Sequence, residues 1–431
     1  MLRDASPNFR EMLKRDRDAE NFVRAPKAGE ILRNPSLAKT FRALASEGKK
    51  GFYTGRVAES IIAIIKQLDG YMEMEDLKNH MEVGTEEADP ISFKFRGQTL
   101  GKGLAPSTNG APDSHNFVEL WEHPPNGQGI VALMCLGILE ELEKDKKIPL
   151  FSREDHNSTL YLHSIIESLR IAFADANWWV TDPAHMAVKS AEMISQPYLA
   201  ERAKLFDSQK SNIPSHGHPG KSPAHNHSDT VYFSVVDKEG NGMSFINSIY
   251  SGFATGIIPQ GCGFTLQNRG ANFELGPDDH PNLYAPSKRP YHTIIPGLLT
   301  HGPEDQRELH SVYGVMGGFM QPQGHVQVLL NMEVFGMNPQ QALDAPRICI
   351  GAGLPDMGDT QGNAVYVEEG VSEATIAGLR KLGHKIEVLH GLDRAMFGRG
   401  QIIRRHLDEE SGIEVYSGGS DPRGDGFAMP V

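Results

Sequence analysis

At 431 residues, with 39% hydrophobic and 23% charged side chains, the chain has the composition of a folded globular protein. Its net charge of −13 argues against a nucleic acid partner, because phosphate binding needs clustered lysine and arginine. The opening residues, MLRDASPNFREMLKRD, contain no apolar run, and no later stretch is long enough to span a bilayer. We therefore expect neither a signal peptide nor contact with a membrane.

Three cysteines, Cys135, Cys262 and Cys349, are too few for a disulfide framework, and none lies in a CxxC pair. Apolar residues or glycines surround them, which is typical of unreactive thiols. Free thiols suit a reducing compartment, so the sequence predicts a cytoplasmic protein.

The first half of the chain is predicted to be mainly helical, because apolar residues recur there at helical spacing. Helices are expected from the Asn34-Pro35 capping signal, from residue 57, over 129–143 and over 160–176. In the first of these, Leu37, Phe41, Leu44 and Ala45 are expected to form one face. One or two strands are expected near residues 91–100.

Residues 208–228 read SQKSNIPSHGHPGKSPAHNHS and have no apolar periodicity, so they predict an exposed, flexible linker. The linker contains His216, His218, His225 and His227, and such a set raises the possibility of a metal site. No acidic or cysteine ligand accompanies them, so a solvated linker is the preferred interpretation. We expect no metal and no organic cofactor.

After the linker the pattern changes to strands. Residues 231–236 predict a strand, 237–241 a turn and 243–248 the returning strand of a hairpin. Further extended segments are expected at 263–266, 292–295 and 310–315. A helix is expected to begin near His325 and to end at Gly336.

Thr230 lies where the predicted linker becomes a strand, and this position suggests a chemical role. A threonine hydroxyl is hardly ionised near neutral pH, so as a nucleophile it needs a base. If the Asp229-Thr230 bond broke, the new α-amine of Thr230, with a pKa of about 7.7–8.0, would supply that base. Attack of the Thr230 hydroxyl on the Asp229 carbonyl would give an ester that water then cleaves. Taken alone, a threonine at the start of a strand is more commonly structural.

Two further features fit this chemistry. Gly317 and Gly318 follow a predicted strand, where unhindered backbone N–H groups can point at a developing oxyanion. Ser248, on the partner strand, offers a hydroxyl to the oxygen of Thr230. In isolation a glycine pair is more often a plain turn, and a serine on a strand is more often a local hydrogen bonder.

Several short motifs follow one another over residues 25–431. In the first half they are Gly51-Phe52-Tyr53, Glu75-Asp76-Leu77, Pro124 to Gly129 and Ala172 to Asp175. In the second half they are Thr230 to Asp237 with Gly240-Asn241, Gly256 to Gly263, Lys288-Arg289-Pro290, Gly317-Gly318, Ala345-Pro346-Arg347 and Ser420-Asp421-Pro422-Arg423. These motifs, in this order, resemble those of gamma-glutamyltranspeptidases, and the segments 267–273 and 317–324 resemble a less-studied branch of that family.

The resemblance implies a four-layer αββα sandwich of the N-terminal-nucleophile hydrolase type, within the α/β (α+β) class. It implies a self-cleaved precursor, with residues 1–229 as part of a large subunit and residues 230–431 as the small subunit. Thr230 is implied as nucleophile and base, Ser248 as its supporting hydroxyl, and Gly317 with Gly318 as the oxyanion hole. An acyl group would pass from an amide to Thr230 and then to water or an amine.

The chain departs from the family pattern where the family recognises its acyl donor. Val231 stands where the family has a threonine next to the nucleophile. Asn272 replaces the acidic residue for the donor's α-amino group, and Arg269 replaces a neighbouring polar contact. His292-Thr293 replaces the serine pair that holds the donor's α-carboxylate. Because an arginine repels an ammonium group, donors that lack the amine, such as glutaryl amides, become candidates.

A second departure is the beginning of the chain, because family members carry a further segment that supplies sheet strands and a donor-binding arginine.

Three possibilities follow from the sequence. The protein is expected to transfer or hydrolyse the gamma-glutamyl group of glutathione or related amides. Alternatively, it is an acylase for glutaryl or other non-amino acyl groups, or a catalytically incomplete homologue. A nucleotide-dependent enzyme is disfavoured, because neither GxxxxGK[ST] nor a GxGxxG after a strand occurs.

Overall fold

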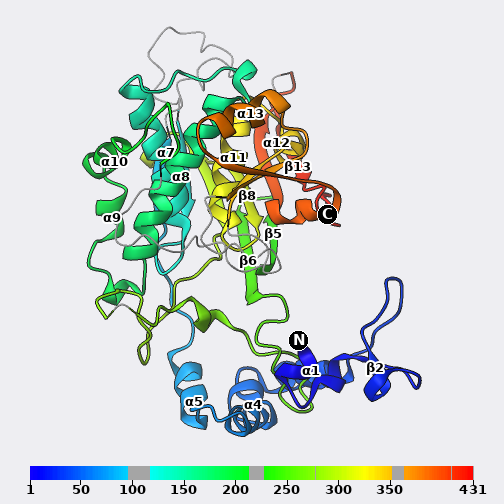
Figure 1. Ribbon diagram of the computed structural model, residues 1–431. Coiled ribbons are helices and arrows are strands. Elements are labelled where there is room, and N and C mark those ends of the chain that lie inside the picture. The colour runs from blue at the N-terminus through cyan, green and yellow to red at the C-terminus, as the bar shows by residue number, and fades with distance from the viewer. Residues whose placement is uncertain (96–116, 213–227, 277, 352–363, 409, 431) are drawn as a thin grey trace. The chain divides into compact units, whose positions relative to one another are not determined.

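The computed structural model describes residues 1–95, 117–212, 228–276, 278–351, 364–408 and 410–430. The chain divides into two compact units (Figure 1). One comprises Met1–Glu87 with Ile249–Asn268, and the other comprises Ala88–Ser248 with Arg269–Val431. Each unit therefore combines residues from both sides of the expected cleavage junction. Among the helices of the described residues, none has the length and apolar character that a bilayer crossing requires.

The smaller unit consists of helices and a loop that returns much later in the chain. Its elements are α1 (Leu2–Ala5), β1 (Lys14–Arg15), β2 (Val23–Arg24), α2 (Pro35–Glu47), α3 (Lys50–Tyr53), α4 (Arg56–Gln67) and α5 (Met74–Val83). Two short 3-10 helices, η1 (Phe9–Met12) and η2 (Glu20–Phe22), lie in the same part of the chain. Ile61 of α4 and Leu77 of α5 pack with Cys262 from the returning loop, and these contacts form the core of the unit.

Helix α2 begins where the capping signal predicts. Asn34 Oδ1 accepts a hydrogen bond from the amide three residues on (2.9 Å), and its Nδ2 donates to the carbonyl oxygen of Gly263 (2.7 Å). On this helix Phe41 is 60% exposed, whereas Thr40 is buried. Thr40 donates to the carbonyl oxygen of Cys262 (3.0 Å), so the helix presents a hydroxyl to a loop backbone there.

The larger unit is a sandwich of helices and strands. Its α-helices are α7 (Gly129–Lys144), α8 (Thr159–Trp179), α9 (Ser190–Met193), α10 (Gln196–Ala203), α11 (Met320–Glu333), α12 (Pro339–Asp344) and α13 (Glu373–Lys381). Its strands are β3 (Ile91–Phe95), β4 (Val118–Glu122), β5 (Ser228–Val236), β6 (Gly242–Ser251), β7 (Gly297–His301), β8 (Glu308–Met316), β9 (Ile348–Ile350), β10 (Ala364–Glu368), β11 (Lys385–Leu389), β12 (Arg399–Leu407) and β13 (Glu414–Ser420). Its 3-10 helices are η3 (Arg153–Asp155), η4 (Pro183–His185), η5 (Arg269–Asn272), η6 (Glu304–Gln306) and η8 (Gly391–Phe397).

Six strands form an antiparallel sheet in the order β13-β12-β8-β7-β4-β3, and a second sheet has the order β11-β10-β9. Helices α7 and α11 pack on one face of the six-stranded sheet, and α8 packs against α7 (Figure 1). Nearly every residue of α7 is buried, which explains why its sequence is almost continuously apolar rather than amphipathic.

The hairpin of β5 and β6 packs on β8 and β12 of the six-stranded sheet. Tyr232 of β5 and Ile246 of β6 pack against Met316 at the end of β8. The close approach requires a glycine at position 314, because a Cβ there would lie 2.5 Å from the ring of Tyr232. Gly314 therefore sets the distance between the two sheets at this point.

The outer face of the hairpin is apolar and exposed. Side chains alternate along a strand, so the even-numbered residues face the larger sheet and the odd-numbered ones face away from it. Val231, Phe233, Val235, Met243 and Phe245 are between 42% and 67% exposed. The described residues thus show three layers of the expected αββα arrangement, namely helices, the six-stranded sheet and the hairpin.

The six-stranded sheet combines both sides of the junction at residues 229 and 230. Strands β3 and β4 precede the junction, and β7, β8, β12 and β13 follow it. Strand β4 pairs with β7, and Trp121 Nε1 donates a hydrogen bond to Thr300 Oγ1 across this pair (2.8 Å). Cleavage at the expected bond would leave both fragments joined within one sheet.

The predicted helices at 57, 129–143 and 160–176 and the predicted hairpin are confirmed, as is the mixed helix-and-sheet class. Strands β4 and β7 were not expected. The extended segment predicted at 263–266 is not a strand, because Gly263 packs tightly on the start of α2, where a Cβ would lie 2.3 Å from Asn34 Oδ1. The linker histidines at 216, 218, 225 and 227 lie outside the described residues.

Two other differences concern the middle of the larger unit. Residues 292–295 form no strand, because the Ile295 amide donates to the side-chain oxygen of Gln321 (3.0 Å) instead of to a neighbouring strand. Helix α11 begins at Met320, five residues before the expected position. Gly324 lies inside this helix because it faces Val315 of β8, where a Cβ would come within 2.6 Å of a methyl group.

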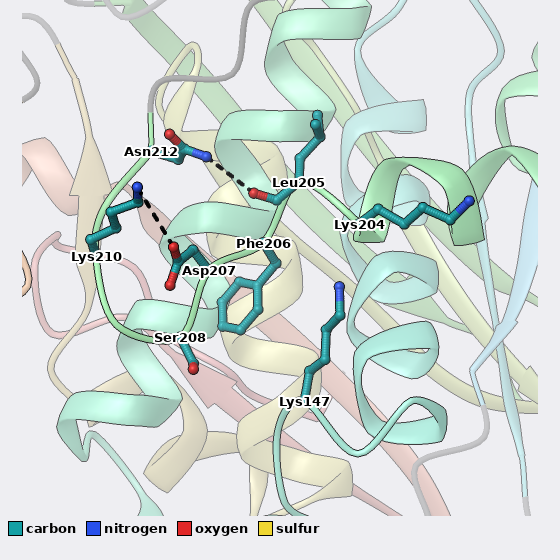
Figure 2. Close-up of a pocket in the computed structure, with 8 residues that line it drawn as sticks. All are labelled: Lys147, Lys204, Leu205, Phe206, Asp207, Ser208, Lys210 and Asn212. Atoms are coloured by element: carbon teal, nitrogen blue, oxygen red, sulfur yellow. Dashed lines mark hydrogen bonds and ion pairs between the residues drawn. The ribbon is translucent and has the colours of Figure 1, made fainter.

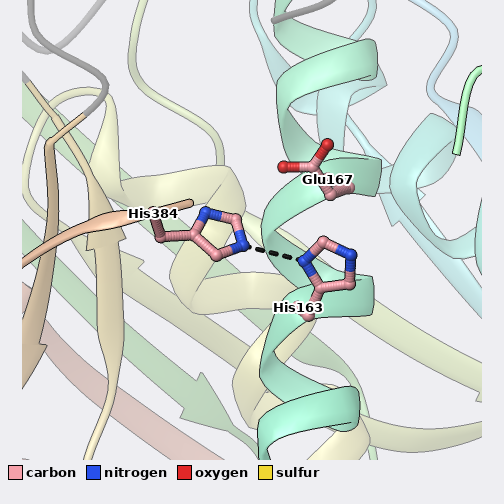
Figure 3. Close-up of side chains that lie close together, drawn as sticks. All are labelled: His163, Glu167 and His384. Carbon is pink, nitrogen blue, oxygen red and sulfur yellow. Dashed lines mark hydrogen bonds between the residues drawn. The ribbon is translucent and has the colours of Figure 1, made fainter. Parts of the chain in front are cut away.

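Two buried histidines, His163 on α8 and His384 before β11, form a chain of hydrogen bonds that ends at Asp207 (Figure 3). His384 Nε2 and His163 Nδ1 lie 2.8 Å apart, and Arg170 lies 3.2 Å from the other ring nitrogen of His384. Arginine can only donate, so His384 Nδ1 accepts from Arg170 and His384 Nε2 donates to His163. His163 Nε2 then donates to the carbonyl oxygen of Asp207 (2.8 Å), which holds the start of the linker.

We predict that Gly314→Ala destabilises the larger unit by about 1–3 kcal/mol, because its methyl group has no room beside Tyr232. Urea unfolding of wild type and variant measures the difference. Gly276→Ala is the matched control, since a Cβ at Gly276 meets no atom within 4 Å. Equal midpoints for wild type and Gly314→Ala would contradict the close contact between the two sheets.

We also predict a contribution of His384 to acid sensitivity. Burial, Arg170 and His163 lower the pKa of His384 from 6.5 to about 3. Between these two values the unfolded chain binds a proton that the folded chain excludes, so the free energy of unfolding falls as pH decreases from 6.5 towards 3. Unfolding of His384→Gln, measured between pH 7 and pH 4, should fall less steeply than wild type. The exposed His406→Gln should keep the wild-type slope.

Candidate active site

Thr230 lies on the inward face of β5 and is 2% exposed. Its hydroxyl donates to Ser248 Oγ on β6 at 3.2 Å. The hairpin places these two residues beside each other because even-numbered side chains of both strands point towards the larger sheet. The structure therefore brings together the two hydroxyls that the sequence analysis assigned to the nucleophile and its support.

An apolar cluster holds three candidate segments next to one another. Tyr232 and Ile246 of the hairpin contact Met316, which precedes Gly317, and the partly buried Ile294 packs against the same group. Ile294 follows Thr293 in the chain. Strand β5, the glycine pair and the predicted donor-binding segment thus share one small core.

Gly317 and Gly318 connect β8 to α11 through backbone conformations that favour glycine. Their φ angles are 135° and 59°, in the left-handed region. A Cβ on Gly317 would lie 3.2 Å from the Cα of Gly398, so the neighbouring chain also excludes a side chain. The pair stands immediately before the first turn of α11, where backbone N–H groups and the helix dipole favour negative charge.

A buried ionic network lies behind this glycine turn. Arg347 is fully buried, donates to the carbonyl oxygen of Phe397 (2.9 Å) and pairs with Asp421 (2.7 Å). Asp421 also accepts from the Gly400 amide (2.9 Å) and pairs with Arg423 (3.0 Å). Although burial alone would raise the pKa of Asp421, the two arginines lower it. The motifs around Arg347 and Asp421 therefore have a structural role.

Gln128 was not identified as a site residue from the sequence. It is fully buried, and its Nε2 donates to the carbonyl oxygens of Thr293 (2.8 Å) and Gly318 (2.9 Å). Its signal in the sequence is its place in the motif from Pro124 to Gly129.

Arg269 and Thr293 form a buried pair. Arg269 Nη1 donates to Thr293 Oγ1 at 2.6 Å. Burial, followed by the charges of Arg269 and His123, lowers the pKa of His292 from 6.5 to about 3. His292 is therefore neutral near pH 7, and Arg269 supplies the positive charge beside it.

Asn272 belongs to the same region. Its Nδ2 donates to the carbonyl oxygen of Tyr291 (3.0 Å), and its own carbonyl oxygen accepts from Asn282 (2.6 Å). Both contacts fix the turn at η5. The amide donor of Asn272 is therefore engaged by the protein, and this side chain carries no negative charge that would attract an ammonium group.

The histidine cluster is a poor fit for a metal. In the part of the chain that the structure describes, His163, Glu167 and His384 are the one group of possible ligands brought within 4.8 Å of one another (Figure 3). Both nitrogens of each ring already take part in hydrogen bonds. Glu167 accepts from Arg170 (2.8 Å) and from the amide of Asn212 (2.8 Å). A cation would have to displace Arg170, so the cluster fits a hydrogen-bonded support better than a metal centre.

A separate open pocket of about 480 Å³ lies beside the start of the linker (Figure 2). Its lining includes Lys147, Lys204 and Lys210. Each ammonium group already has a partner, namely the Ala203 carbonyl, Glu201 and Asp207 respectively. None of the predicted site residues lines this pocket.

Comparisons with known proteins show which proteins this chain resembles. A glutathione hydrolase-like YwrD proenzyme of Bacillus subtilis (strain 168) is 31% identical over 416 residues, which cover 96% of this chain and 69% of that protein. An oxamate amidohydrolase proenzyme of Klebsiella pneumoniae subsp. pneumoniae is 32% identical over 404 residues, covering 94% of this chain and 66% of that protein.

A solved structure shows the same fold. The cephalosporin acylase of Bacillus halodurans superposes with a TM-score of 0.74 at 38% identity, covering 93% of this chain and 63% of that one. The chain thus spans about two thirds of the length of these relatives. The sequence profile described as gamma-glutamyltranspeptidase matches residues 2–431. This chain belongs to the gamma-glutamyltranspeptidase family.

Proposed function

We propose that the protein is a self-cleaving amidohydrolase or acyltransferase whose nucleophile and base are Thr230. The observation that carries this proposal is the placement of the Thr230 hydroxyl, buried at the start of β5 and 3.2 Å from Ser248 Oγ. The relatives named as proenzymes support a cleaved precursor. The proposed products are residues 1–229 and 230–431.

The first step is cleavage of the chain. The Thr230 oxygen attacks the carbonyl carbon of Asp229, the C–N bond breaks, and the Thr230 nitrogen takes the hydroxyl proton. Water then hydrolyses the resulting ester, which leaves a carboxylate on Asp229 and a free amine on Thr230. That amine is the base that an unactivated threonine hydroxyl lacks.

The second reaction acts on an external amide. The Thr230 oxygen attacks the amide carbonyl, and the amine of Thr230 carries the proton to the leaving amine. The N–H groups of Gly317 and Gly318 are the proposed donors to the oxyanion, at the positive end of α11. Water or an amine then attacks the ester and releases the acyl group.

The first candidate donor is a gamma-glutamyl amide such as glutathione, in keeping with the family. A second candidate, an acyl amide without an α-amino group, is favoured by a specific observation. Arg269 is a buried cation beside the neutral His292, and Asn272 offers no negative charge to an ammonium group. The similarity to a cephalosporin acylase and an oxamate amidohydrolase supports this second candidate.

We predict that purified wild type runs as two fragments on a denaturing gel, whereas Thr230→Ala remains one band and has no amidase activity. Thr230→Ser keeps a hydroxyl and should still be cleaved, more slowly. Mass spectrometry should show that the small fragment begins at residue 230. Active wild-type protein with residues 229 and 230 still joined would disprove the proposed nucleophile. An intact, inactive wild type would support the catalytically incomplete homologue.

A second prediction separates the donors. Wild type is assayed with gamma-glutamyl and glutaryl anilides side by side, with and without an amine acceptor. Replacing Arg269 by Gln removes a positive charge that opposes an ammonium group, so the preference should shift towards the gamma-glutamyl donor by about tenfold. Arg269→Lys is the control, because it replaces the guanidinium without removing the positive charge. An unchanged preference in Arg269→Gln would remove Arg269 from donor selection.

A further inference from the structure

Gln128 contacts two segments that have different tasks in the proposed function. One is residues 291–293, called the donor-binding segment, and the other is the turn of Gly317 and Gly318, called the oxyanion turn. Its Nε2 donates to Thr293 of the donor-binding segment and to Gly318 of the oxyanion turn, at 2.8 and 2.9 Å. An amide nitrogen has two hydrogens, so these two bonds use both of them. One side chain therefore fixes the separation between two carbonyl groups that lie far apart in the sequence.

The remaining contacts of Gln128 make its position rigid. Its Oε1 accepts from the Tyr291 hydroxyl (3.2 Å), and its backbone amide donates to the carbonyl oxygen of His292 (3.0 Å). The His292 amide donates in turn to the carbonyl oxygen of Asn126 (2.9 Å). A fully buried side chain whose amide group is completely hydrogen-bonded has one favourable orientation.

A stacked ring pair runs beside this connection. Tyr291 and Phe319 have ring centroids 5.8 Å apart and planes inclined by 25°. Tyr291 belongs to the donor-binding segment, and Phe319 follows the glycine turn. The stacked rings keep the two segments close. Hydrogen bonds are directional, so the side chain of Gln128 determines how the two segments are aligned with each other.

We infer that Gln128 is a positioning residue that holds the donor-binding segment in register with the oxyanion turn. The inference rests on the proposed function. An extended acyl donor bound at its far end by the 292–293 segment delivers its carbonyl to Gly317 and Gly318 only if the spacing between the two segments is fixed. A short acyl donor that does not reach the 292–293 segment does not depend on that spacing.

The test compares two substrates in one variant. Gln128→Met keeps a side chain of similar length and removes all three side-chain hydrogen bonds. It should lower kcat for the better of the gamma-glutamyl and glutaryl anilides by about 10- to 100-fold, because small misplacements of reacting groups have effects of this size. Hydrolysis of p-nitrophenyl acetate should change by less than about threefold.

Gln327→Met is the matched control. Gln327 is also buried, and its Nε2 bridges two carbonyl oxygens, those of Gln323 and Ile348, both at 3.0 Å. Its Oε1 accepts from the Ile348 amide (2.8 Å). It is thus a chemically equivalent bridge away from the candidate site residues, and its loss should leave the ratio of the two substrates as in wild type.

Equal losses on both substrates in Gln128→Met, or the same change of ratio in Gln327→Met, would overturn the inference and leave the proposed function intact. Wild type that is not cleaved before Thr230 and hydrolyses neither anilide would instead disprove the proposed function, and the positioning role of Gln128 with it. Hydrogen exchange measured by mass spectrometry provides a readout independent of turnover. Exchange should rise in residues 290–296 and 316–322 of Gln128→Met, and unchanged exchange there would disprove the coupling of the two segments.

Discussion

The candidate site depends on the buried ion pair of Arg347 and Asp421. Removing charges from water is costly, and breaking such a pair by losing one partner typically costs about 3–5 kcal/mol. Here the pair is completed by hydrogen bonds to the carbonyl oxygen of Phe397 and from the amide of Gly400. These bonds fix the entry to β12, and Gly398 at that entry backs directly onto Gly317. The turn of Gly317 and Gly318 is thus supported by a charge network that has no part in the proposed chemistry.

The packing of the hairpin of β5 and β6 also supports this turn. Tyr232 contacts Met316 and lies over Gly314, so the position of β5 relative to β8 is determined by contact between a large ring and a bare backbone. Close-packed contacts of this kind transmit small displacements with little loss. Any shift of Tyr232 would therefore move Thr230, two residues earlier on the same strand, with respect to the turn.

Much of this arrangement could be predicted from the sequence, because the signals were local. Alternation of apolar residues after the linker predicts the hairpin, and the hairpin alone brings Thr230 and Ser248 together. Helix α11 begins before the expected position, and Gly324 lies inside it because its bare backbone allows contact with Val315.

The role of Gln128 could not be predicted, since its partners come from two segments well over a hundred residues away. Strands β4 and β7 were not predicted for a related reason, because each is short and is stabilised by neighbouring strands on both sides. These neighbours are β3 and β7 for β4, and β4 and β8 for β7. The exposure of Phe41 on α2 shows what periodicity does not predict. Periodicity indicates that a helix forms, but the surface it meets decides which side is covered.

The sheet shared by β4 and β7 has a consequence for the proposed cleaved form. In the uncut chain, an unfolded molecule would refold by a unimolecular route. If the bond before Thr230 is cut as proposed, unfolding would release two separate polypeptides, and recovery would require their encounter at low concentration. The persistence of the cut form would then be governed by the rate at which the sheet opens rather than by an equilibrium.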